Sequence, residues 1–98
     1  MTLKQKKNGD ILTIIPEGRL DSSTSGEFAE YIEAGFTGDI KKLVLDFSGV
    51  DFISSKGLRV IVSVYKGLDG RAMEINGANN AVMEIFRLSG LLKVIEVK

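Results

Sequence analysis

The segment LVLDFSGVDFISSKGLRVIVSVYK, residues 43–66, places a strand pattern ahead of a helix pattern and so indicates the fold class. With Lys42 it begins as KLVLDF, a short β-rich apolar run typical of a central parallel strand. Its second half repeats apolar residues at spacings of three and four, which is the periodicity of an amphipathic helix. The apolar positions are Leu58, Ile61, Val62, Tyr65 and Leu68. The polar positions of the opposite face are Arg59, Ser63 and Lys66.

Upstream of this segment, the sequence predicts a hairpin and a first helix. Residues 8–10 read NGD, a turn signal between LKQKK and ILTII, and we expect Pro16 to close the second strand. The residues DSSTSGEF favour a helix start, because Thr24 and Glu27 have the spacing of a capping box.

Downstream, the pattern continues with a strand, a helix and a last strand. AMEIN, residues 72–76, alternates as a strand does. Asn79 or Asn80 is a suitable N-cap for a third helix, and Gly90 lies where its C-cap should be. KVIEV, residues 93–97, predicts a final short strand.

This order of elements predicts an α/β fold. A chain of 98 residues encloses one hydrophobic core, so we expect a single domain over residues 1–98. Strands that alternate with helices pair in parallel through crossover connections. We therefore expect a mostly parallel sheet with one antiparallel strand from the N-terminal hairpin, and with the helices packed on it.

The composition excludes several classes of site. Basic and acidic residues balance at 13 each, so the charge does not suggest a nucleic-acid partner. The chain has no cysteine and no histidine, which excludes thiol catalysis, the usual zinc sites and the Ser-His-Asp arrangement. We therefore expect no enzyme, no metal site and no cofactor. Apolar runs are short and the N-terminus lacks a signal-peptide core, so we expect a cytoplasmic protein without membrane insertion.

Two serines, Ser54 and Ser55, lie where the loop after the central strand meets the helix. Binding sites in open α/β sheets collect at such strand ends. Helix capping explains one serine, at about 1 kcal/mol of stability. The second serine, and the apolar pair Phe52 and Ile53 between polar residues, indicate more than a cap. Because a helix N-terminus also stabilises a phosphate, this loop is a candidate phosphorylation site.

Residues 43–66 resemble the signature of the STAS domain, in particular that of bacterial anti-sigma factor antagonists. In that family a strand ends in an Asp-Phe-Ser turn, an apolar pair follows, and a serine and a glycine open a helix. EGRLDSSTSGEF, residues 17–28, resembles the family's Gly-x-Leu-Asp segment, and residues 81–97 resemble its later helix and final strand. The family fold has four helices, and we expect no counterpart of the short C-terminal one before Lys98.

The resemblance implies an anti-sigma factor antagonist, a regulator of transcription that binds an anti-sigma factor with serine kinase activity and so releases a sigma factor. By the same resemblance the kinase phosphorylates Ser55, or alternatively Ser54, and a phosphatase reverses the modification. The residues implied in partner binding are Asp21, Ser22, Ser54, Ser55, Lys56, Gly57 and Arg59. A phosphate adds about two negative charges, which would oppose docking if Asp21 lies nearby.

Three other functions compete with this one. A soluble STAS subunit of a transport or stress-signalling complex would use the same fold without a phosphorylation switch. Ser63 and Lys66 have the Ser-x-x-Lys spacing of some acyltransfer enzymes, but we expect both on the solvent face of a helix. A nucleotide site at the strand ends is disfavoured because no phosphate-binding glycine motif is present.

Overall fold

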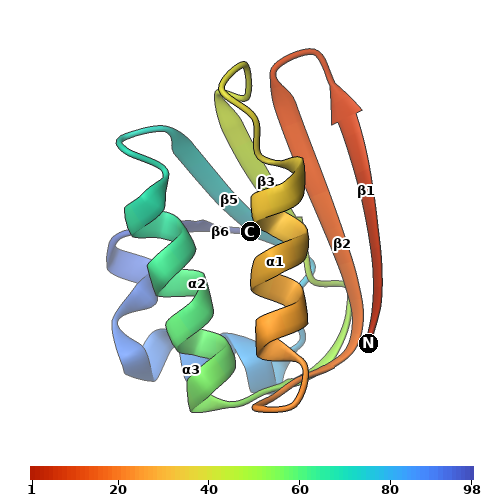
Figure 1. The fold of residues 1–98 in the computed structure, drawn as a ribbon. Helices are drawn as coiled ribbons and strands as arrows, with labels where there is room; N and C mark the ends of the chain where they lie inside the picture. Colours follow the sequence, from red (N-terminus) through yellow and green to blue (C-terminus); the bar gives the residue numbers. More distant parts are fainter.

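The computed structural model describes residues 1–98 as one sheet with helices packed against it (Figure 1). The strands are β1 (Thr2–Asn8), β2 (Ile11–Leu20), β3 (Lys42–Asp46), β4 (Gly49–Ile53), β5 (Ala72–Asn76) and β6 (Glu96–Val97). The helices are α1 (Ser25–Gly35), α2 (Ser55–Gly67) and α3 (Asn80–Ser89), followed by the 3₁₀ turn η1 (Leu91–Lys93). No helix combines the length and the apolar character that a bilayer crossing requires.

The sheet has the mixed topology that the sequence predicts. Its strand order is β1-β2-β3-β5-β6, with β4 also paired to β2. Only β1 and β2 are antiparallel, and they are joined by the Asn8–Asp10 turn, where Gly9 has a φ of 62°. All other strand pairs are parallel. The prediction of a mostly parallel sheet with an antiparallel N-terminal hairpin is therefore confirmed.

Strand β2 does not end at Pro16, and this prediction was wrong. The strand continues to Leu20 because it has two successive parallel partners. Ile11–Ile14 pair with β3, and Glu17–Leu20 pair with β4. Pro16 lies between these two paired stretches, where its missing N–H removes no bond to either partner. Residues 18–23, GRLDSS, are consequently divided between the end of β2 and the loop that follows it.

The strand β4 is an element that the sequence analysis missed. It follows a turn in which the Asp46 carboxylate accepts hydrogen bonds from the Ser48 N–H at 3.0 Å and from the Ser48 hydroxyl at 2.7 Å. The Val50 N–H also donates to the Phe47 carbonyl at 3.0 Å. This turn ends β3 and starts β4, so that both strands lie against β2.

The helix ends agree with the sequence in two cases out of three. Ser54 caps α2 and Asn79 caps α3, and Gly90 ends α3 with a φ of 81°. The predicted capping box of Thr24 and Glu27 is wrong, because the Thr24 side chain makes no cap hydrogen bond. Its hydroxyl instead accepts from the Asp21 N–H at 2.9 Å and donates to the Arg19 carbonyl at 2.7 Å.

The final strand is shorter than predicted. Only Glu96–Val97 pair with β5, since Leu91–Lys93 form the turn η1. The predicted range KVIEV is therefore corrected at its N-terminal side. The structure has three α-helices and no fourth one before Lys98.

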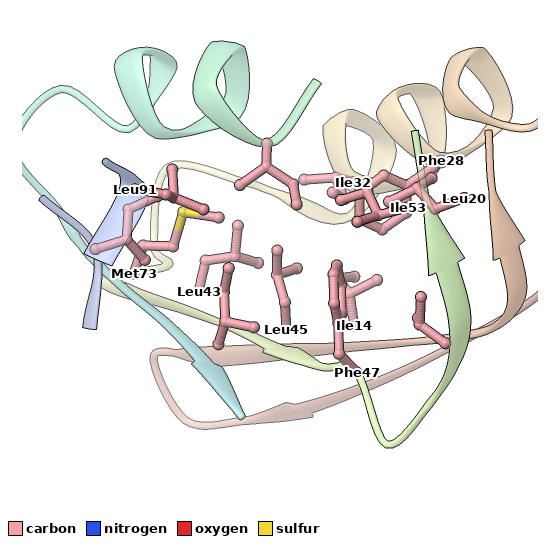
Figure 2. Close-up of a cluster of buried hydrophobic side chains, with 14 of the residues drawn as sticks. Ile14, Leu20, Phe28, Ile32, Leu43, Leu45, Phe47, Ile53, Met73 and Leu91 are labelled. Carbon is pink, nitrogen blue, oxygen red and sulfur yellow. The ribbon is translucent and has the colours of Figure 1, made fainter. Parts of the chain in front are cut away.

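The core lies between the helices and one face of the sheet (Figure 2). Alternate residues of the central strands, such as Ile14, Leu43 and Leu45, are fully buried under the helices. Phe47 lies in the middle, with its ring centroid 6.3 Å from that of Phe28 and 6.0 Å from that of Phe86. Helices α1 and α2 lie side by side in front of the sheet in Figure 1, which brings their N-termini to the same edge.

Candidate functional site

The carboxyl ends of β2 and β4 meet at one edge of the sheet. Leu20 and Ile53 are register partners, so Asp21 and Ser54 leave the sheet next to each other. The Ser54 N–H donates a hydrogen bond to the Leu20 carbonyl at 2.9 Å. This contact joins the loop that follows β2 to the loop that starts α2, which meets the condition that Asp21 lies near the serines.

The two serines of the second loop have different environments. The half-buried Ser54 is the N-cap of α2, and its hydroxyl oxygen accepts from the Gly57 N–H at 3.1 Å. Ser55 is the first residue of the helix, is exposed, and has a hydroxyl without any hydrogen bond within the chain. Capping therefore accounts for Ser54 and leaves the hydroxyl of Ser55 free.

Gly57 lets the helix approach the end of β2. It is buried, and a Cβ at this position would lie 2.7 Å from the Leu20 carbonyl oxygen and 3.2 Å from Ile53 Cγ1. A real Cβ does not tolerate the first of these distances from a backbone atom. Gly57 thus allows the close packing that positions the loop. Because it is buried and has no side chain, it presents no side-chain contact to a partner.

Asp21 is held as an anion by its own loop. Its Oδ1 accepts from the Ser23 hydroxyl at 2.7 Å and from the Ser23 N–H at 2.9 Å, while its Oδ2 lies 3.6 Å from Arg19 Nε. The hydrogen bonds from Ser23 lower the pKa of the Asp21 carboxyl below its ordinary value of 3.8. Ser22 is exposed in the same loop.

Arg19 and Phe52 add an exposed aromatic contact that the sequence analysis missed. They are register partners across β2 and β4, and the guanidinium carbon of Arg19 lies 4.4 Å from the ring centroid of Phe52. Phe52 is 37% exposed, whereas its neighbour Ile53 is buried in the core. The pairing could not be predicted without the strand β4.

The exposed face of α2 is basic. Lys56 and Arg59 are exposed and lie one helical turn apart, and neither makes an ion pair. Ser63 and Lys66 continue along the exposed face, as predicted, and no hydrogen bond joins them. The structure thus brings the candidate partner-binding residues to one edge and one helix.

No group of three or more potential metal-ligating side chains comes together in this chain.

A comparison of the sequence with models of protein families finds a match over nearly the whole chain. The model described as "STAS domain" matches residues 2–98. The chain belongs to the STAS domain family. The Asp46–Ser48 turn, the serine loop and Gly57 all lie within the matched residues of this STAS domain.

Three similar proteins match this chain over most of its length and most of theirs. An anti-sigma-B factor antagonist of Listeria monocytogenes is 27% identical over 96 residues, which are 96% of this chain and 84% of that protein. The crystal structure of a putative anti-sigma factor antagonist from Thermotoga maritima superposes with a TM-score of 0.90 at 23% identity, over 97% of this chain and 84% of that one. The phosphorylated form of Bacillus SpoIIAA superposes with a TM-score of 0.76 at 16% identity, over 99% and 91% of the two chains.

Proposed function

We propose that this STAS domain is an anti-sigma factor antagonist whose docking is controlled by phosphorylation of Ser55. The observation that carries the proposal is that the two serines differ in their contacts. Ser54 caps α2, and Ser55 presents an exposed hydroxyl without a hydrogen-bond partner. The names of the relatives point in the same direction, since the Listeria protein is an anti-sigma-B factor antagonist. The partner would be an anti-sigma factor that is itself a serine kinase.

The geometry favours Ser55 over Ser54 as the modified residue. A kinase needs a hydroxyl that is accessible and free to attack the phosphate donor, and Ser55 meets both conditions. Phosphorylation of Ser54 would place a bulky group on a half-buried oxygen that already accepts the Gly57 N–H. The helix cap would then be disturbed, at a cost of about 1 kcal/mol. Ser54 stays the alternative site.

A phosphate on Ser55 would leave the fold intact. The first residues of a helix carry N–H groups without intrahelical partners, and the helix dipole favours negative charge there. Arg59 lies four residues after Ser55, on the same helical face, and is unpaired, so it can approach the phosphate. The modification would therefore act on the surface and not on stability.

The effect on docking would be electrostatic. Phosphorylation adds about two negative charges at an edge that already holds the anionic carboxylate of Asp21. An interface that buries this edge would have to desolvate both groups. A penalty of about 2 to 5 kcal/mol weakens binding by roughly thirty-fold to several thousand-fold. Removal of the phosphate by a phosphatase would restore docking.

The experiment is a binding titration of three variants against an anti-sigma factor kinase from the same genome. Ser55→Ala should bind as tightly as the parent, and Ser55→Asp should bind at least about tenfold more weakly. Ser54→Asp tests the alternative site, with the same charge one residue earlier. If Ser55→Asp binds as the parent does, the proposed switch is wrong, and a docking subunit without a switch becomes the better account.

A further inference from the structure

A groove of about 500 Å³ runs along one side of α2 and begins one helical turn after the serine loop. Its second wall is the end of α3 and the segment that follows it, which lies beside α2 in Figure 1. The apolar side chains that line it are Leu58, Val62, Leu91 and Val94. Arg59 and Lys66 line it as well, and no acidic side chain does. The groove is thus apolar and bordered by positive charge only.

The positive charges of the groove are not used within the chain. Neither Arg59 nor Lys66 takes part in any of the seven ion pairs of the structure, and α2 contains no Asp or Glu. The two residues are seven positions apart, so they project from the same face of α2 about 10 Å apart along its axis. Two carboxylates at the same separation would be complementary to them.

The segment that contains the second wall holds most of the exposed large hydrophobic side chains. Five large hydrophobic side chains of the chain are exposed, and three of them lie within residues 88–94. They are Leu88 at 71%, Leu92 at 39% and Val94 at 57% exposure. Of the three, Val94 lines the groove, and Leu88 and Leu92 are its neighbours in sequence. Exposed apolar side chains that line a groove are typical of a surface that a partner covers.

We infer that this groove binds an acidic amphipathic helix of a partner protein, with apolar side chains against Val62 and Val94 and with two carboxylates, two turns apart, paired with Arg59 and Lys66. A helix is the fitting form because the groove is bounded by α2, whose backbone groups are bonded internally, so an added strand would find no free N–H and C=O groups. Arg59 belongs to both surfaces, but Lys66 and Val94 lie outside the one proposed around Ser55, so the contact extends beyond the phosphorylation switch.

The test uses the full chain and a synthetic helical peptide as the probe. The peptide carries Glu at two positions seven residues apart and Leu at the positions between them that share their face. One control peptide has Lys in place of both Glu residues, and a second has Ser in place of the Leu residues. Fluorescence anisotropy should give a dissociation constant below about 1 mM for the acidic peptide, at least about tenfold lower than for either control.

Variants of the protein locate the contact. Lys66→Glu and Val94→Ser should each weaken binding of the acidic peptide, the first by about tenfold or more. Lys6→Glu is the matched control, because Lys6 is an exposed and unpaired cation on β1 and its replacement changes the net charge equally. Circular dichroism melts should be the same for all three variants. Lys66→Glu leaves the serine loop untouched, so failure here and failure of the Ser55 switch are separable.

Three results would overturn the inference. One is no binding of the acidic peptide to the parent below about 1 mM. The second is equal binding to Lys66→Glu and Lys6→Glu. The third is self-association of the parent that Lys66→Glu abolishes, since α1 carries the exposed Glu27, Glu30 and Glu33 and a second copy would then be the occupant.

Discussion

The Ser54 N–H donates to the Leu20 carbonyl at 2.9 Å, and this bond holds the N-terminus of α2 against the end of β2. Because Leu20 precedes Asp21 and Ser54 precedes Ser55, the same bond places the anionic loop beside the free hydroxyl. The candidate site therefore depends on how closely α2 can approach β2, which can be tested by substitution.

Gly57→Ala should destabilise the domain by about 1 to 3 kcal/mol, because the new Cβ would lie 2.7 Å from a backbone oxygen. Gly67→Ala in the same helix is the matched control, since a Cβ there meets no atom within 4 Å. The control should be neutral or slightly stabilising. Urea unfolding of both variants measures the difference, and equal stabilities would contradict the close packing of α2 on Leu20.

Ser54→Ala should lower the free energy of unfolding by about 1 kcal/mol, because it removes the hydroxyl that accepts the Gly57 N–H. Ser55→Ala should leave it unchanged within about 0.5 kcal/mol, since the Ser55 hydroxyl has no partner. Chemical denaturation of the two variants compares them directly. If Ser55→Ala lowered the free energy of unfolding more than Ser54→Ala does, the cap of α2 would be Ser55 and not Ser54.

Ser25→Ala should stabilise the domain by about 1 kcal/mol. The Ser25 hydroxyl is fully buried at the start of α1 and makes no hydrogen bond, so folding removes it from water without compensation. The measurement is the midpoint of thermal unfolding. A clear loss of stability would mean that this hydroxyl has a partner in solution.

Stability should decrease as the pH falls from about 4 toward 2. The pKa of the Asp39 carboxyl is lowered from 3.8 to about 2, first by its hydrogen bond from Lys7. A lowered pKa in the folded state means that the carboxylate contributes stability above its unfolded pKa and loses it as the pH falls through the folded pKa. The pKa values of Asp21, Glu74 and Glu84 are also lowered and act in the same direction.

Asp39→Asn should reduce this acid dependence. The Asp39 side chain is exposed, so solvent and salt screen the effect, and adding salt should reduce the difference further. Asp51→Asn, at an exposed aspartate without an ion pair, is the control. Unfolding free energies measured at several pH values test the prediction, and an unchanged slope for Asp39→Asn would contradict it.

Much of the fold could be predicted from local patterns. Helical spacing after Leu58 and the caps Asn79 and Gly90 depend on neighbouring residues alone, and the structure confirms them. AMEIN is also a strand, as predicted, but its burial does not alternate, because Met73, Glu74 and Ile75 are all buried. Strand β4 could not be predicted in this way. It has only five residues, Asp51 and Phe52 within it are exposed, and it exists because β2 extends past Pro16 to pair with it.

The candidate site was predictable in position but not in detail. Parallel strands end at the same edge of a sheet, which predicts where the site lies. That Asp21 and Ser54 are neighbours at this edge depends on the pairing of Leu20 with Ile53 across β2 and β4, which local patterns do not predict. Local patterns also do not decide which of the two adjacent serines is the cap. Serine is favoured at either position, and the start of α2 depends on its packing against Leu20. The contact of Arg19 with Phe52 required the register of β4.

The most direct test of the central claim is phosphosite mapping by mass spectrometry of the protein isolated from its native cells, in growth and under stress. The account predicts phosphate on Ser55, with an occupancy that changes between the two conditions. Phosphate on Ser54 alone, or no phosphate on either serine when the peptide that contains both is well covered, would contradict it.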